Sequence, residues 1–250
     1  MVIIYFNQII YMKILSVILA RGGSKGIPKK NLSLLGDKPL VVHMIEKCLN
    51  VSKRYEMDVI LSSDSDEIID ISKTAGAWVP FKRPKELALD SSESIDAVKH
   101  AIKEAESILN KTYNLIIYAQ PTSPLCRESD FFKCIDALIN DKNLESCVPI
   151  TSVSTHPFKM KRMLNDDRII NFIDQGFEDM RGRQTLPKVY KRAGSIYVSR
   201  RDVVMYKNTL VGDPCKGIIV PNSTAIDIDR IEDLELARIF YEKLNLKKDE

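Results

Sequence analysis

The sequence lacks the signatures of several common enzyme classes. It contains no G-x-x-x-x-G-K-[ST] string, which excludes a Walker A phosphate loop, and no G-x-G-x-x-G string, which argues against a nicotinamide enzyme. None of its three histidines lies at a recognisable acid–base spacing, and no serine carries the nucleophile-elbow pattern. A covalent mechanism is therefore not favoured.

Cysteine and net charge are also sparse. The five cysteines form no C-x-x-C pair and no metal-binding spacing, which is typical of a protein from a reducing compartment. The formal net charge is only +3, because Lys and Arg alternate with Asp and Glu without forming a long basic block. The composition therefore does not indicate nucleic-acid binding and is compatible with an anionic small molecule as the partner.

The N-terminal residues are apolar but do not form a convincing signal peptide. No basic residues precede the apolar part of residues 1–11, MVIIYFNQIIY, and Asn7 and Gln8 interrupt it. A membrane span needs about 20 mostly apolar residues, which this region reaches only with polar breaks. We therefore expect residues 1–11 to be an N-terminal extension of a cytoplasmic protein that does not contact a membrane, with Met12 as a second possible start.

Short apolar runs alternate along the chain with helical patterns. Runs rich in branched residues predict buried strands, and apolar stripes at a spacing of three and four residues predict amphipathic helices. The expected strands are residues 13–20, 57–63, 77–81, 114–120, 146–153, 194–199 and 216–221. The expected helices are residues 40–49, 66–76, 92–109, 129–141 and 229–244.

This alternation predicts one α/β domain over residues 12–250, with a mainly parallel sheet wrapped by helices on both faces. Ligands of such sheets bind outside the carboxyl ends of the strands. The polar stretches 21–31, 62–64 and 120–124 follow three expected strands, so we expect them to converge on one site. Residues 154–192 break the rhythm and are interpreted as an inserted arm with a hairpin turning at residues 165–167.

The loop LARGGSKGIPKKN, residues 19–31, is the strongest candidate for a binding element. Its glycines, Gly22, Gly23 and Gly26, can adopt positive φ and let the backbone approach a ligand closely. Successive N–H groups in such a turn form a nest for an anion. The loop also carries the cations Arg21, Lys25, Lys29 and Lys30. Together these features suit a polyphosphate, although a solvated basic turn is the alternative.

A pair of aspartates near the C-terminus is the candidate metal site. If residues 225–230 are a strand, Asp227 and Asp229 point to the same face. Two carboxylates on one face make a partial shell for Mg²⁺, which phosphate oxygens and water can complete. The alternative is that Asp229 and Glu232 form a capping box for the last helix, which leaves Asp227 unexplained.

Two further polar stretches can each be interpreted in two ways. QPTSP, residues 120–124, offers hydrogen-bonding groups at a strand end, or is a rigid loop without a ligand. The serines of RPKELALDSSES, residues 83–94, cap the following helix, or one of them faces a base.

Taken together, the motifs ARGGSKGIPKKN, RPKELALDSSES, QPTSPL, RQTLPKVY, GSIY and IDIDRIEDL resemble, in this order, those of the acylneuraminate cytidylyltransferases, the CMP-sialic acid synthetases. The resemblance runs from about Lys13 to the final helix. It implies a Rossmann-like three-layer fold of the nucleotide-diphospho-sugar transferase type, with an arm that crosses to a second subunit in a homodimer.

The resemblance also implies a reaction. CTP and a nine-carbon 2-keto sugar acid, of the sialic or legionaminic type, give a CMP-sugar and pyrophosphate. The anomeric hydroxyl attacks the α-phosphorus directly, and Mg²⁺ offsets the charge on the phosphates, so that catalysis is positioning and electrostatics.

On the nucleotide side, the resemblance implies that Arg21 and Lys30 hold the triphosphate beside Gly22 and Gly23. The residues that it implies around the nucleoside are Asn31, Arg83 and Ser94.

On the sugar side, Gln120 and Tyr197 would face the substrate, and Asp227 and Asp229 would bind the metal. Two cations of the arm would reach the sugar site of the partner subunit, where they suit a carboxylate. These arm residues are Lys159 and Arg183.

The chain departs from the family pattern at three places on the sugar side. Cys126 follows QPTSPL where the family usually has Arg, and Arg127 comes one residue later; Ala193 replaces the usual Asn, and Lys191 a common Arg. These changes bear on the identity of the sugar more than on the chemistry. They also leave open a non-catalytic CTP-binding or regulatory protein on the same scaffold.

Overall fold

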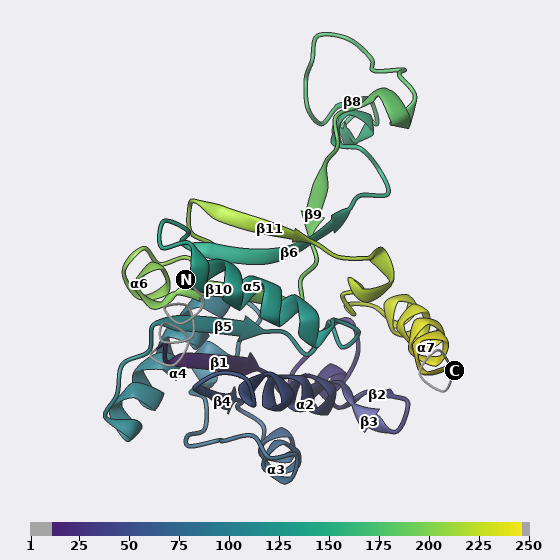
Figure 1. The fold of residues 1–250 in the computed structure, drawn as a ribbon. Helices are drawn as coiled ribbons and strands as arrows, with labels where there is room; N and C mark the ends of the chain where they lie inside the picture. Colours follow the sequence, from purple (N-terminus) through teal and green to yellow (C-terminus); the bar gives the residue numbers. More distant parts are fainter. Residues whose placement is uncertain (1–11, 247–250) are drawn as a thin grey trace.

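The computed structural model describes residues 12–246, whose centre is a seven-stranded sheet (Figure 1). Its strands are β1 (Ile14–Leu19), β4 (Met57–Ser62), β5 (Leu115–Ala119), β6 (Ser146–Ser152), β9 (Tyr190–Arg192), β10 (Ile196–Arg200) and β11 (Cys215–Ile219). The order is β11-β6-β10-β5-β1-β4, and β9 also pairs with β6. Only β9 and β10 run antiparallel to their neighbours. The predicted mainly parallel α/β sheet is confirmed.

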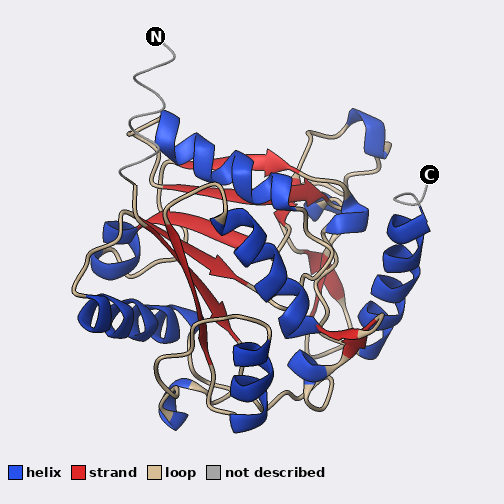
Figure 2. Cartoon of the chain, turned by 60° about the horizontal axis from the view of Figure 1, so that its bottom comes forward, coloured by secondary structure: helices blue, strands red, loops and turns tan. Residues whose placement is uncertain are grey.

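Helices cover both faces of this sheet, which gives three layers (Figure 2). One face packs against α2 (Leu40–Ser52), α3 (Asp66–Thr74) and α5 (Glu128–Asn140), the other against α4 (Ser94–Leu109) and α6 (Arg201–Tyr206). Strand β1 shows why: alternate side chains of a strand point to opposite faces, so Ile14 and Ile18 join one core while Leu15 and Val17 join the other. A strand buried on both faces has the continuous apolar run seen in the sequence.

A smaller core fixes the C-terminal segment against the sheet edge. Helix α7 (Ile231–Leu246) packs with the short hairpin of β2 (Leu34–Leu35) and β3 (Lys38–Pro39) and with Ile226 and Ile228. The hairpin turn requires a glycine, because Gly36 has φ +64° and its missing Cβ would lie 2.6 Å from the Tyr241 ring. This packing places the residues before α7 beside the loop after β1.

Residues 154–192 project away from the sheet as an arm (Figure 1). The predicted hairpin is present: β7 (Lys161–Met163) pairs antiparallel with β8 (Ile169–Asn171), and Asp167 has φ +62° in the turn. Two 3₁₀ turns flank it, at Pro157–Lys159 and Arg183–Thr185. The arm returns to the sheet through β9.

One local prediction is wrong. Residues 77–81 do not form a strand, since Trp78 makes only an isolated bridge to Ile60 and Pro80, which lacks an N–H, follows two residues later. His43 of α2 is buried, with Nε2 2.8 Å from the Leu35 carbonyl oxygen. The predicted extension 1–11 lies outside the described residues. Within residues 12–246, no helix has the length and apolar character needed to cross a bilayer, and the cytoplasmic location stays a prediction.

Candidate active site

A cavity of about 330 Å³ opens at the carboxyl ends of β1 and β5. One wall is the loop after β1, the second is the segment 83–97, the floor is residues 118–122, and the last wall is the segment before α7. The side chains and backbone that line it include most of the residues predicted from the sequence: Arg21, Gly23, Lys30, Asn31, Arg83, Ser94, Gln120, Asp227 and Asp229. Segments far apart in the sequence therefore meet where the strand order predicted a site.

The glycines of the loop do not act in the way the sequence suggested. None of Gly22, Gly23 and Gly26 has positive φ. Instead, Gly26 allows close packing, because a Cβ at this position would clash with the Asp229 carbonyl oxygen. A Cβ at Gly22 would meet Ser65, whereas one at Gly23 would meet nothing within 4 Å. Close approach of two backbones therefore requires the glycine at 26, and the nearby Ser65 side chain favours the glycine at 22.

The expected anion nest is also partly filled. The N–H of Gly22 donates to the Asp64 carboxylate at 2.9 Å, so this amide already has an anionic acceptor. The stretch 62–64 therefore supports the loop from behind and does not line the cavity as predicted. Asn31, which is buried, braces the loop by donating from Nδ2 to the Arg21 carbonyl oxygen at 2.9 Å.

Each of the four cations in the loop forms an ion pair within the protein. Lys30 is the most buried of them, with a side chain 15% exposed. The pairs are Arg21–Asp90 (2.8 Å), Lys25–Asp90 (3.0 Å), Lys29–Glu67 (2.6 Å) and Lys30–Asp229 (2.8 Å). The loop is thus neutralised by carboxylates from three other segments. Lys25 and Lys29 are largely exposed, as in a solvated basic turn, whereas Arg21 and Lys30 are mostly buried and line the cavity.

Arg83 is a buried cation that faces the cavity. Its guanidinium donates to the Ser62 hydroxyl (3.0 Å) and to the Ser62 carbonyl oxygen, and no carboxylate forms an ion pair with it in the described part of the chain. Burial lowers its pKa to about 10, so it remains charged at neutral pH. A buried charge without a counter-ion favours an electron-rich ligand in the adjoining space.

Tyr118 and Tyr197 form a stacked pair beside the cavity. Their ring centroids are 5.6 Å apart with an interplanar angle of 22°, and Tyr118 lines the cavity while Tyr197 lies behind it. The hydroxyl of Tyr118 is 3.4 Å from that of Ser94. Arg192, at the base of the arm, lies over the Tyr197 ring at 5.7 Å. Tyr197, which was predicted to face the sugar, therefore does not itself line this cavity.

Asp227 and Asp229 lie in a segment that is not a strand of the sheet, so the strand considered for residues 225–230 is not formed. The predicted alternation holds nevertheless, since Ile226 and Ile228 are buried in the core under α7. The segment is tied to the floor of the cavity by the Ile228 N–H, which donates to the Thr122 carbonyl oxygen at 2.8 Å.

The capping box proposed for Asp229 and Glu232 is not formed. Asp233 takes that role, because its carboxylate accepts from the N–H groups of Asp229 (3.1 Å) and Arg230 (2.9 Å). The Asp229 side chain, 70% exposed, is left to face the cavity and Lys30.

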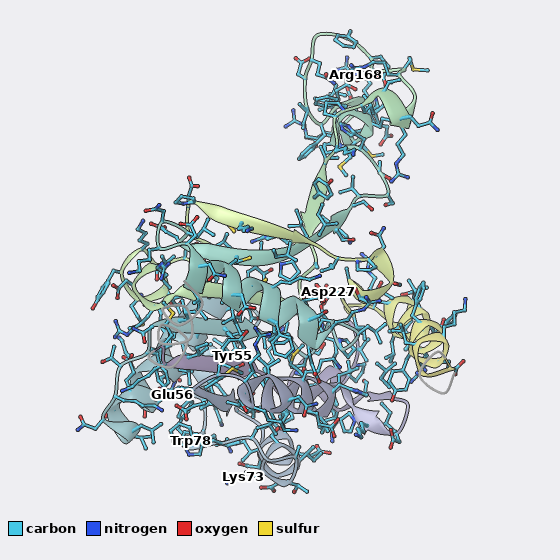
Figure 3. All side chains as sticks on the ribbon, viewed as in Figure 1. Tyr55, Glu56, Lys73, Trp78, Arg168 and Asp227 are labelled. Atoms are coloured by element: carbon cyan, nitrogen blue, oxygen red, sulfur yellow. The ribbon has the colours of Figure 1, made fainter. Side chains whose placement is uncertain are left out.

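The two aspartates have the properties of a partial metal shell. Burial raises the pKa of Asp227 above its ordinary value, with the nearby Asp229 adding to the effect and a hydrogen bond from Thr122 opposing it. Asp227 lies on the segment that leads into α7 (Figure 3). Its Oδ1 is buried and has no hydrogen-bond partner within the described residues. A buried, unpaired carboxylate oxygen beside a second carboxylate fits a divalent cation. In the described residues no cluster of three acidic, histidine or cysteine ligands exists, so other ligands would complete the shell.

Comparison with known proteins agrees with this geometry. The family model described as "Cytidylyltransferase" matches residues 15–248. The chain is 32% identical over 230 residues to a pseudaminic acid cytidylyltransferase of Campylobacter jejuni, covering 92% of this chain and 97% of that protein. It is 31% identical over 238 residues to an N-acylneuraminate cytidylyltransferase of Escherichia coli, covering 94% of this chain but 54% of that longer protein.

The chain belongs to the cytidylyltransferase family. Among solved structures, a CMP:2-keto-3-deoxy-manno-octonic acid synthetase complexed with CTP has a TM-score of 0.68 and 19% identity, covering 92% of this chain and 99% of that one. At this identity the likeness concerns the fold, and it supports the predicted nucleotidyltransferase architecture.

Three cations that were considered for the sugar side lie outside the cavity. Lys159 and Arg183 are in the arm, where Arg183 donates to the Val153 carbonyl oxygen at 2.6 Å and lines a separate hollow at the arm's base. Arg127 is exposed and lines another hollow beside α2 and α7. Cys126 is buried in the core, which raises the pKa of its thiol to about 12. The one-residue shift therefore does not bring a guanidinium into the cavity of this subunit.

Several lining residues escaped the sequence reasoning. Tyr118 was hidden within an expected strand, and the polar residues of 83–94 were treated as serine caps, so the acidic ones were overlooked. The overlooked residues are Ser24, Asp90, Glu93 and Tyr118, whereas Thr122 belongs to the stretch 120–124 that was expected at the site. An aspartate inside a serine-rich turn opposite a cationic loop is the signal that could have identified Asp90.

Proposed function

We propose that this protein activates a nonulosonic acid with CTP and releases a CMP-sugar and pyrophosphate. One observation carries the proposal: the cationic loop and the two aspartates line the same cavity. Arg21 and Lys30 lie on one wall, and Asp227 and Asp229 lie on another. Such an arrangement suits a polyphosphate with a bound cation. The two relatives, a pseudaminic acid cytidylyltransferase and an N-acylneuraminate cytidylyltransferase, add the sugar class.

In the proposed reaction the anomeric hydroxyl oxygen of the sugar bonds to the α-phosphorus, and the bond from that phosphorus to the bridging oxygen of pyrophosphate breaks. The hydroxyl proton passes to solvent in the same reaction. Arg21 and Lys30 offset charge on the phosphates, and buried Arg83 with Ser94 holds the nucleoside end beside Tyr118. Asp227 and Asp229 would hold Mg²⁺, which supplies further charge neutralisation at the phosphates. Residues that position and neutralise suffice, since no nucleophilic side chain is required.

Three types of nonulosonic acid are candidate substrates. The pseudaminic acid cytidylyltransferase and the N-acylneuraminate cytidylyltransferase are almost equally similar to this chain, at 32% and 31% identity. Legionaminic acid is the third type suggested by the motifs. The test is a panel assay in which protein, CTP and Mg²⁺ are fixed and pyrophosphate release is measured with each acid. Release with one acid supports the proposal; CTP binding by calorimetry without release from any acid would favour the non-catalytic alternative.

We further propose that the arm reaches a second subunit in a homodimer. The arm exposes large apolar side chains that gain from burial, namely Met163 (68% exposed), Ile169 (59%), Phe172 (65%), Phe177 (56%) and Met180 (83%). In this arrangement Lys159 and Arg183 serve the sugar carboxylate of the partner subunit.

A mixing experiment tests the arm separately from the chemistry. Asp227→Ala and Arg183→Ala homodimers are each expected to be inactive, and subunit exchange between them would recreate one site with both residues intact. Recovered activity on mixing supports a shared site. A monomer by analytical ultracentrifugation, or no recovery after demonstrated exchange, contradicts it.

A further inference from the structure

Asp90 occupies a position that the proposed reaction does not use. It lies in the turn between Arg83 and α4, lines the cavity, and is held by two cations at once, Nη1 of Arg21 at 2.8 Å and Nζ of Lys25 at 3.0 Å. The hydrogen bond from Lys25 and the contact with Arg21 hold the pKa of Asp90 below its ordinary value, so the carboxylate is ionised at neutral pH.

The turn that carries Asp90 is a small closed unit. The Ser92 hydroxyl donates to the Glu86 carbonyl oxygen at 2.6 Å and accepts from the Leu89 N–H at 3.1 Å, and the Ser92 N–H returns to the Leu89 carbonyl oxygen. Arg21 adds a contact of 3.4 Å to the Ala88 carbonyl oxygen. Asp90 is therefore presented to the loop by an ordered turn, and the Arg21 side chain bridges the two segments.

The other carboxylates that neutralise the loop differ from Asp90. Glu67 pairs with Lys29 outside the cavity lining, and Asp64 holds the Gly22 backbone from behind. Asp229 belongs to the proposed metal site together with Asp227, and it can bind the divalent cation once it releases Lys30. Asp90 has no such second role: it is the cavity carboxylate that sits on Arg21, where a phosphate group of the nucleotide would go.

We propose that Asp90 is an internal counter-ion that stands in for phosphate on Arg21 and Lys25 and is displaced when the triphosphate binds. The proposal rests on the proposed function, because it assigns Arg21 to the triphosphate. Two anions on one guanidinium repel each other, so nucleotide binding is an exchange of carboxylate for phosphate and the affinity is lower than the cations alone would give.

The exchange has a consequence for the end of the reaction. When pyrophosphate leaves, Asp90 returns to the same cations and competes with rebinding of the product. Asp90 is thus a positioning residue that keeps the loop ordered while empty and limits the affinity for both CTP and pyrophosphate, without touching the reacting atoms.

The test uses Asp90→Asn, which keeps the shape and removes the charge. We expect the Kd of pyrophosphate and of CTP, measured by calorimetry, to fall about three- to tenfold, since two partly exposed ion pairs no longer compete. KM for CTP should fall in parallel, and product inhibition by pyrophosphate should strengthen. Asp90→Glu, which restores the charge, should return both values toward those of the wild type.

Glu67→Gln is the matched control, because it removes one negative charge from an ion pair of the same loop outside the cavity. It should change the Kd of pyrophosphate less than twofold. An equal effect in Glu67→Gln and Asp90→Asn would reduce the result to net charge and overturn the proposal. With an active wild type, unchanged CTP binding in Asp90→Asn would show that Asp90 does not compete with the nucleotide, and weaker binding would show that Asp90 helps to bind it; either result would overturn the proposal. If the wild type neither binds nor converts CTP, the proposed function itself fails.

Discussion

The contact between Gly26 and the segment before α7 provides the sharpest test of how the cavity is assembled. A Cβ added at Gly26 would lie far inside 3.0 Å of the Asp229 carbonyl oxygen and 3.4 Å from its carbonyl carbon. Both neighbours are backbone atoms, which cannot rotate away. Gly26→Ala must therefore push the cationic loop and the two aspartates apart by on the order of 1 Å, and a displacement of that size in a catalytic arrangement costs about 100-fold in rate.

The stability effect of the same substitution should be moderate. Overpacking costs about 1–3 kcal/mol, so we expect a clear drop in melting temperature but a folded protein at 25 °C. The assay is steady-state pyrophosphate release with a thermal melt on the same sample. Gly23→Ala is the control for the melt, because its Cβ meets nothing within 4 Å and its melting temperature should be unchanged or slightly raised. A Gly26→Ala variant with wild-type kcat/KM and melting temperature would refute this description of the loop.

Three further predictions concern the charged groups of the cavity. The pKa of Asp227 is raised in the folded protein, so its ionisation opposes folding: its contribution to stability is present at low pH and is lost as the pH rises through the folded pKa. Asp227→Asn should therefore raise the melting temperature at pH 7 but not at pH 4, and an equal gain in stability at both pH values would contradict this reasoning. Asp227→Ala and Asp229→Ala should each abolish turnover in a folded protein. Full activity of both alanine variants would show that the two aspartates do not take part in the reaction. Arg83→Gln should weaken CTP binding by about 10- to 100-fold, the range for loss of a charge-assisted hydrogen bond, as measured by calorimetry. Unchanged affinity in a folded variant would place the nucleoside elsewhere.

Much of the fold was predictable because its causes are local. A strand buried on both faces reads as a continuous apolar run, and helices α2 and α4 show their buried stripe directly in the sequence. The rule that parallel strands present their carboxyl ends at one edge then placed the cavity beside Arg21 and Gln120. Residues 77–81 failed because a short apolar stretch interrupted by Pro80 supports one bridge and no ladder.

The amino-acid order alone predicts the alternation of strands and helices and the edge at which the polar loops meet, because both follow from patterns within short windows. The family resemblance follows from the order of motifs along nearly the whole chain. Which charges meet becomes visible only in the folded chain: Asp90 holds Arg21 and Lys25, Asp233 and not Glu232 caps α7, and Arg127 faces away from the cavity. Ion pairs and backbone contacts depend on distances between segments that are remote in the chain. No local periodicity encodes those distances, and packing of the three layers sets them.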